Sequence, residues 1–514
     1  MKNFLEKKYK LVVGTILGFM LVVSLLNAWN DSAIFDETAH IGAAYSYVTQ
    51  QEIRLNPEHP PLIKDLAGLP LLFMDLNFDT SLPFWTGELK NKWDEGQWAS
   101  GRHLLYEAGN DPDKIIFWSR FPIVILSIIF GLFIFKWGKE LAGTLAGLIA
   151  LTLYAFDPNI LGHNHYVTTD LGIVAFMTFS FYFYFKFIKY PTWKNVALAG
   201  LFLGLLQLAK FSSIIAFPIF AFATVVYPFF THMPADTKNK LSFRMKKLGE
   251  YIGKGAAAFA LSIVLIWIAY FINTFNMTQE TVGRVIDANF SPQTDNVLQI
   301  KTNQALHVLN NNAITRPMAE YSVGMGYVFR RVAGGNGAYF LGEVSSTAFP
   351  AYFPVVFLIK ESIPALFLML FALTLVAIRC ASHCRKIFKG HSKIYPEISK
   401  YMRAHITEFS LFLFILLYTY VSITGNLNIG FRHLFPILPF IYLLTAKTVA
   451  NFLRNNIYHH KSIASFEHNS PKALAIAKME ARENQKVRIF SVAFVLLFAY
   501  LIAGTVFAYP YYMS

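Results

Sequence analysis

Long apolar runs recur along the chain and constrain its fold more than any other feature. Crossing about 30 Å of hydrocarbon takes a helix of about 20 residues. Runs near this length occur at 11–29, 115–135, 141–156, 168–185, 195–209, 212–230, 255–275, 351–378, 406–423, 434–450 and 489–509. Since 55% of the residues are hydrophobic and 15% are charged, we predict an all-α polytopic membrane protein with about eleven transmembrane helices. The first run is longer than a signal-peptide core and lacks a small-residue cleavage site, so we expect a retained helix.

Basic residues in the connections predict how the helices are oriented. They precede the first apolar run at Lys2, Lys7, Lys8 and Lys10 and recur at 136–139, 186–194, 238–247, 379–403 and 454–488. An odd number of spans puts all of these segments on one side, which the positive-inside rule assigns to the cytoplasm. We therefore expect a multi-pass protein of the cell membrane with a cytoplasmic N-terminus. The net charge of +14 then reflects topology and does not indicate nucleic-acid binding.

Two connections predicted to be external, 30–114 and 276–350, are much longer than a link between helices requires. Loops of this length usually carry function. In the first loop, residues 39–48 have an amphipathic helical pattern, and Pro60-Pro61 opens a second run at 62–73, so we expect two helices on the outer membrane surface. The second loop is rich in glycine and is expected to form loops and short helices. With no internal repeat and no separate soluble segment, the chain is predicted to be a single membrane domain, 1–514.

Acidic and basic side chains concentrate directly after the first apolar run. Asp36 and Glu37 lie where the helix leaves the bilayer, and partial desolvation there raises the basicity of a carboxylate, as a proton acceptor needs. Asp36 could equally be a helix cap. The segment NPEHPPLIK then brings Glu58, His59 and Lys64 around a rigid Pro-Pro. Such rigidity suits a substrate-binding loop, although an ordinary polar turn is the alternative.

A second polar cluster lies in the short connection near 157–167, on the same predicted face. It contains His163 and ends at Asp170, where the next apolar run begins. Carboxylates and histidines on one face could steer a hydroxyl or hold a divalent cation, but no fixed metal-ligand spacing such as HExxH is present, so a metal stays an open alternative. Asp170 could also simply cap its helix. Cys380 and Cys384, the two cysteines, indicate neither a disulfide framework nor a zinc site.

Positive charges on the external side run against the bias of the other connections. Lys210 lies at an external junction of two apolar runs, and Arg432 and His433 lie in an external turn. Lysine and arginine at such positions can snorkel to the interface. Because the positive-inside rule disfavours them there, we interpret them as binding an anionic phosphate headgroup, which arginine can contact bidentately.

These motifs together resemble the protein O-mannosyltransferase branch of the GT-C membrane glycosyltransferases, a group that includes the lipid A aminoarabinose transferases. The resemblance rests on the acidic pair at Asp36-Glu37, on HPPxxK from His59 to Lys64, and on TTD at 168–170. The segments YFLGE and YFPVVFLIKESIP, between 339 and 364, extend it over most of the chain. The second external loop is too short for the large β-rich domain of the eukaryotic enzymes, which favours a bacterial-type relative.

The resemblance implies inverting transfer of a sugar from a polyprenyl-phosphate carrier to an acceptor hydroxyl on a protein, lipid or glycan, without a nucleotide-sugar site. By position, Asp36 matches the general base and Asp170 matches the second acid. Glu37 and His59 would line the same cavity. Lys210 and Arg432 are assigned to the donor phosphate from their charge and location.

Two other functions remain open from the sequence. A lipid or glycan transporter would place its acids near mid-membrane, usually with broken helices related by symmetry, and neither feature is evident. A catalytically silent protein with the same fold would have no need of Asp36 and Asp170.

Overall fold

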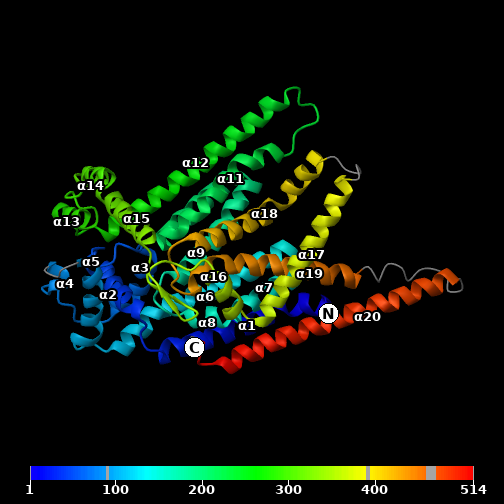
Figure 1. The fold of residues 1–514 in the computed structure, drawn as a ribbon, viewed down its shortest axis with the longest axis horizontal. Helices are drawn as coiled ribbons and strands as arrows, with labels where there is room; N and C mark the ends of the chain where they lie inside the picture. The colour runs from blue at the N-terminus through cyan, green and yellow to red at the C-terminus, as the bar shows by residue number, and fades with distance from the viewer. Residues whose placement is uncertain (1, 88–91, 389–393, 459–470, 513–514) are drawn as a thin grey trace.

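Helices make up almost all of the chain in a computed structural model that describes residues 2–87, 92–388, 394–458 and 471–512 (Figure 1). Within these ranges, eight helices are long and apolar enough to cross a membrane: Glu6–Asn30, Pro112–Ala142, Asp170–Lys189, Phe211–Phe230, Lys240–Asn273, Ile363–Arg385, Ile394–Thr424 and Phe431–Asn455. The predicted fold class, an all-α polytopic membrane protein, is confirmed.

The number of spans remains a prediction, because three of the expected spans coincide with shorter apolar helices. These are Thr144–Ala155, Trp193–Ala209 and Val492–Ala508. The bounds of the expected span 351–378 are wrong. The segment divides into α16 (Tyr352–Lys360) and α17 (Ile363–Phe388), with Glu361 in an extended conformation between them. Pro364 gives the physical reason: within a continuous helix its ring would clash with the carbonyl of Lys360, and it has no N–H to donate.

The helical body is built from the elements that contain the apolar runs. They are α1 (Lys2–Asn30), α6 (Pro112–Ala142), α7 (Thr144–Ala155), α8 (Pro158–His163), α9 (Asp170–Lys189), α10 (Trp193–Ala209), η3 (Phe211–Ala216), α11 (Phe217–Val226), η4 (Tyr227–Phe230), α12 (Lys240–Asn273), α18 (Ile394–Thr424), η5 (Phe431–Ile437), α19 (Leu438–Tyr458) and α20 (Pro471–Ala508), together with α16 and α17. Here η marks a short 3₁₀ helix, except for η2 below, which is a π-helical turn.

The two long connections form their own elements at one end of this body. The first contains α2 (Phe35–Gln50), α3 (Leu62–Gly68), η1 (Leu69–Phe73), α4 (Pro83–Thr86), α5 (Lys92–Arg102) and η2 (His103–Glu107); the second contains α13 (Gln279–Asn289), α14 (Val297–Asn310), α15 (Arg316–Gly334), β1 (Ala338–Phe340) and β2 (Glu343–Ser345). Figure 1 shows α2, α4 and α5 at the same end as α13, α14 and α15, while the α11–α12 connection lies at the opposite end. This arrangement is the one expected if both long loops share a face.

The expected surface helices differ in how they are packed. The segment 62–73 is helical, and Leu72 and Phe73 are exposed, with Phe73 at 91%. In contrast, α2 is not amphipathic in the fold, because residues on all of its faces from Ala39 to Tyr47 are buried, mainly against α3 and α5. The predicted amphipathic pattern is therefore wrong for this helix, since the rest of the loop folds over it, while its position at the outer membrane surface stays a prediction.

The second loop contains the expected short helices and, in addition, a hairpin that we did not predict. Strands β1 and β2 pair antiparallel, with Phe340 opposite Glu343. The two residues between them, Leu341 and Gly342, both have positive φ, 51° and 93°. Two-residue hairpin turns with positive φ match the twist of the strands, and glycine reaches that region without strain.

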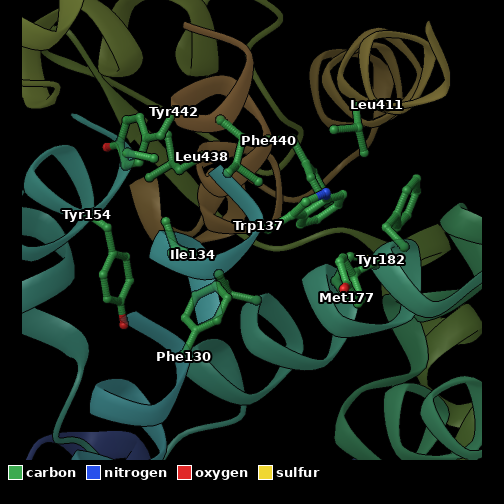
Figure 2. Close-up of a cluster of buried hydrophobic side chains, with 14 of the residues drawn as sticks. Phe130, Ile134, Trp137, Tyr154, Met177, Tyr182, Leu411, Leu438, Phe440 and Tyr442 are labelled. Carbon is green, nitrogen blue, oxygen red and sulfur yellow. The ribbon is translucent and has the colours of Figure 1, made fainter. Parts of the chain in front are cut away.

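Aromatic packing holds the helical body together. Figure 2 shows Trp137 of α6, Tyr182 of α9 and Phe440 of α19 among the buried side chains of this core. The rings of Trp137 and Phe440 lie 6.3 Å apart and those of Trp137 and Tyr182 lie 5.5 Å apart. Close helix contact depends on glycine: a Cβ added to Gly138 of α6 would lie 2.9 Å from the Cα of Gly147 in α7. This packing fixes where α6, α7, α9 and α19 end, and so positions the site.

Candidate active site

Four charged side chains from four elements meet at the end of the helical body that carries the long loops. The Arg432 guanidinium lies 2.5 Å from Asp36 Oδ2 and 3.6 Å from Asp170 Oδ2, and Lys210 Nζ lies 2.8 Å from Asp170 Oδ1. We call these four residues the charged cluster. All four were selected from the sequence, and they lie up to 396 positions apart.

Local structure explains how each member reaches the cluster. Helices α9 and α10 are packed neighbours that follow one another through a short turn, so the start of α9, at Asp170, lies beside the end of α10, where Lys210 leaves the helix in an extended conformation (φ −163°, ψ 141°). A carboxylate at a helix N-terminus is also favoured by the helix dipole. Arg432 is the second residue of the 3₁₀ turn η5, which follows Gly430, whose φ of 113° suits glycine.

Exposure separates the two carboxylates of the charged cluster. The Asp36 side chain is 32% exposed, whereas the Asp170 side chain is 7% exposed and contacts both cations. The two cations are intermediate, at 20% for Lys210 and 24% for Arg432. The two positive and two negative charges of the cluster balance. Because Asp36 is the more exposed carboxylate, it is the one that a ligand can reach, whereas the enclosed Asp170 holds the cations in place.

Histidines surround the charged cluster as neutral rings. The His59 ring lies 5.0 Å from the ring of His40, one turn after Asp36 on α2. Burial lowers the pKa of His59 well below its ordinary value, and burial followed by the charge of Lys64 lowers the pKa of His40 to about 3. Both imidazoles are therefore uncharged near neutral pH.

Of the two other predicted residues of this region, His433 belongs to η5 and His163 packs against it. His433 follows Arg432 in η5 and is partly buried. The ring of His163 packs edge-on against Phe435, with 5.1 Å between ring centres, while its Nδ1 lies 2.9 Å from the Asn159 carbonyl oxygen. The second of these contacts lies within its own segment. His163 therefore supports η5, and neither contact joins it to the charged cluster.

Glu37 does not join Asp36, and the prediction that it lines the same cavity does not fit its position. Its carboxylate is fully buried and accepts hydrogen bonds from Arg120 Nε (2.9 Å) and Nη2 (2.6 Å), from Val167 N (2.9 Å) and from Ile34 N (3.1 Å). Arg120 also donates to the carbonyls at the end of α1, among them that of Asp31 at 2.7 Å. The pair therefore anchors α1, α2 and α6 to one another.

Arg120 was missed in the sequence reasoning, although it carries a signal. It is an arginine inside the apolar run 115–135, and a charge within such a run needs a partner. The structure supplies that partner in Glu37.

Lys64 is likewise directed away from the charged cluster, which corrects its assignment to substrate binding. The fully buried ammonium lies 2.8–2.9 Å from four oxygens: Tyr47 Oη, Asn56 O, Asn56 Oδ1 and His59 O. An ammonium group has three N–H donors and no acceptor, so these contacts use its full capacity. Lys64 closes the 56–59 loop and thereby places His59.

Glu58, the remaining predicted residue, lies beside the charged cluster and forms an ion pair with Arg331 of α15. The two residues line an open cavity of about 420 Å³ together with Gln97, Trp98, Tyr327 and Arg330. The sequence argument that singled out Lys210 and Arg432 would also have selected Arg330 and Arg331, because they are positive charges in a loop predicted to be external.

A metal was left open from the sequence. Within the described ranges, no group of three or more His, Cys, Asp and Glu side chains is arranged to hold a metal ion.

The fold and the charged cluster define a polytopic helical membrane protein with paired carboxylates and cations at one end of its spans. The profile of the dolichyl-phosphate-mannose-protein mannosyltransferase family matches residues 114–267. The resemblance indicated by the motifs is thus confirmed for this segment, which contains Asp170 and Lys210. The sequence matches no curated protein.

Two solved structures to which this chain is similar are of proteins named as transferases. The S. cerevisiae protein O-mannosyltransferase Pmt1-Pmt2 complex bound to the sugar donor is 16% identical, over 53% of this chain and 34% of that one, with a TM-score of 0.37. The oligosaccharyltransferase AglB of Archaeoglobus fulgidus, in complex with an inhibitory peptide and a dolichol-phosphate, is 13% identical over 96% of this chain and 56% of that one, with a TM-score of 0.49. The chain thus spans between 34% and 56% of the length of these proteins.

Proposed function

We propose that the chain is an inverting glycosyltransferase that moves a sugar from a polyprenyl-phosphate carrier to an acceptor hydroxyl on a protein, lipid or glycan. The observation that carries the proposal is the arrangement of the charged cluster, in which the accessible carboxylate of Asp36 pairs with Arg432 and Asp170 pairs with both Arg432 and Lys210. The family profile matched over 114–267 supports the reaction class.

Lys210 and Arg432 bind the carrier phosphate. Their side chains are partly exposed, at 20% and 24%, and both are held by Asp170. An arriving phosphate competes with Asp36 for Arg432, because both are anions in reach of the same guanidinium. Donor binding therefore releases the Asp36 carboxylate at the moment when a base is needed.

Asp36 is the general base in this mechanism. It takes the proton of the acceptor hydroxyl while the acceptor oxygen bonds to the anomeric carbon. The bond between that carbon and the carrier phosphate oxygen breaks, and the phosphate leaves with the electron pair, its charge neutralised by Lys210 and Arg432. A single displacement inverts the anomeric centre. Asp170 is too enclosed to act as a second nucleophile, so it serves as a positioning residue for the cations.

The location of the charged cluster favours this function over transport. Its members lie in the first turns of α2 and α9, at the end of α10 and in η5, whereas transporter sites lie near mid-membrane on broken helices. The positive-inside pattern of the connections supports an external active site and a cytoplasmic N-terminus in the cell membrane.

The test is sugar transfer by purified protein in nanodiscs, from a panel of radiolabelled polyprenyl-phosphate sugars to membrane extracts. We expect Asp36→Asn to lower the rate by about 10²–10⁴-fold, the usual contribution of a general base. Asp113→Asn, at an exposed position of α6, is the matched control and should transfer at the wild-type rate. Full activity of Asp36→Asn would remove it as the base.

Donor binding is tested separately with Arg432→Ala. We expect a weaker affinity for the polyprenyl-phosphate sugar and normal expression, because Arg432 is a partly exposed contact. Arg284→Ala, which removes an exposed arginine of α13, controls for loss of charge. Unchanged donor affinity in Arg432→Ala would contradict the phosphate assignment.

A further inference from the structure

The cavity beside Glu58 has a lining that differs from a typical small-molecule pocket. Its six lining residues are Glu58, Gln97, Trp98, Tyr327, Arg330 and Arg331. Every one of these side chains carries a hydrogen-bonding atom, and none is aliphatic, whereas ligand pockets are usually lined mainly by apolar groups. The volume of about 420 Å³ falls within the range of small-ligand sites.

Two of the lining side chains, Gln97 and Arg330, are held by hydrogen bonds to residues outside the cavity. The Gln97 amide accepts a 2.5 Å hydrogen bond from Asn56 Nδ2, which fixes its plane. The Arg330 guanidinium donates to the Asn289 carbonyl at 2.5 Å and lies 5.3 Å from the centre of the Tyr327 ring. Such preorganised polar groups lose little conformational entropy when a ligand binds.

The cavity also lies next to the charged cluster. Its wall residue Trp98 stacks on Phe35, with 4.1 Å between ring centres, and Phe35 directly precedes Asp36. On the other side Glu58 directly precedes His59, whose ring contacts His40 on the same helix as Asp36. These ring contacts connect the cavity wall to α2, the helix that carries the proposed base.

From this lining and location we propose that the cavity binds a saccharide, so that the acceptor of the proposed transfer is a glycan or a glycan-bearing lipid. That the bound saccharide is the acceptor rests on the proposed function. Planar carboxylate, amide and guanidinium groups offer paired donors and acceptors that match neighbouring sugar hydroxyls. The Trp98 ring offers a flat apolar face with a polar edge, which suits the C–H face of a sugar ring.

An acceptor peptide fits the same lining less well. An apolar side chain of a peptide would be buried best against aliphatic walls, and none of the six lining residues is aliphatic. The array below therefore carries both classes of ligand, so that a peptide acceptor becomes an outcome of the test.

The experiment measures binding of the full-length protein, in nanodiscs clustered on beads for avidity, to an array of neutral and acidic oligosaccharides and to an array of Ser/Thr-containing peptides. We expect wild type to retain a subset of the oligosaccharides. Trp98→Ala and the isosteric Glu58→Gln should each lower that retention by at least about tenfold, which corresponds to 1.4 kcal/mol. Trp193→Ala, at an exposed tryptophan that starts α10, is the matched control and should bind as wild type does.

Asp36→Asn separates this inference from the proposed function, because it should keep saccharide binding while losing transfer. Saccharide retention that depends on Trp98, without transfer from any donor, would leave the binding site standing and overturn the transferase proposal. Transfer without saccharide retention, equal retention by Trp98→Ala and wild type, or Trp98-dependent retention of peptides alone would each overturn the saccharide site.

Discussion

The ion pair between Glu37 and Arg120 provides the sharpest test of how this fold is held together. Both side chains are fully buried, and the two carboxylate oxygens of Glu37 accept four hydrogen bonds. In Glu37→Gln, one of these oxygens becomes an NH₂ group facing N–H donors, and the Arg120 charge loses its counter-ion. Breaking a buried pair in this way costs about 3–5 kcal/mol, which raises the unfolding equilibrium constant by at least about a hundredfold.

The assay is unfolding of the purified protein by a graded mixture of SDS and mild detergent, followed by intrinsic fluorescence. Glu280→Gln is the matched control, since Glu280 pairs with Arg284 at the surface with side chains 81% and 53% exposed, and such pairs contribute about 0–1 kcal/mol. A double variant, Glu37→Gln with Arg120→Met, should be less unstable than the two single losses added together, because it leaves no unpaired charge.

One result would refute the reasoning directly. If Glu37→Gln unfolded at the wild-type midpoint while sugar transfer fell as far as in Asp36→Asn, Glu37 would be a catalytic residue and the anchoring role would be wrong. The reverse pattern, a large loss of stability with residual transfer in the folded fraction, is the one expected from the contacts.

Two further predictions concern other buried charged groups. Lys64→Met leaves the side-chain oxygen of Asn56 and the carbonyl of His59 without their donor, at about 1–3 kcal/mol each. Hydrogen exchange should therefore quicken across 52–62 relative to wild type, and unchanged protection there would show that Lys64 does not hold the loop. Glu320 is buried with no hydrogen-bond partner for either carboxylate oxygen among the described residues, and burial raises its pKa from 4.5 to about 8. The folded state therefore holds this proton more tightly than the unfolded state, so the stability contributed by Glu320 is full below pH 4.5 and is lost as pH rises through about 8. Glu320→Gln should flatten this loss of stability with pH. Parallel profiles of unfolding free energy against pH for variant and wild type would contradict the prediction.

Residue chemistry in the sequence was sufficient to select the members of the charged cluster. Lys210 and Arg432 stand out because they break the charge bias of the connections, and Asp36 and Asp170 because each lies at the boundary of an apolar run. These signals depend on the cost of charge near a bilayer, which acts on each position separately. They need no knowledge of which residues are neighbours in space.

The same signals failed where burial within protein replaced contact with water. Lys64 in the HPPxxK motif was assigned to a ligand, but four oxygens of its own loop surround it. Helix α2 was predicted to be amphipathic, but α3 and α5 pack on it and residues on all of its faces are buried. In both cases the sequence pattern is the one expected for an exposed loop, and the cover comes from residues that no local pattern identifies.

By itself, then, the sequence determined the helical membrane class, the positions of most apolar segments and the set of charged residues from which a site could be built. The tertiary structure decided which of those residues share a site. Asp36 and Glu37 illustrate the physical reason: neighbours on a helix point about 100° apart, so one carboxylate reaches Arg432 while the other reaches Arg120. The positions of α6 and η5, set by contacts distant in sequence, bring Arg120 and Arg432 to α2 and so assign each carboxylate its partner and therefore its role.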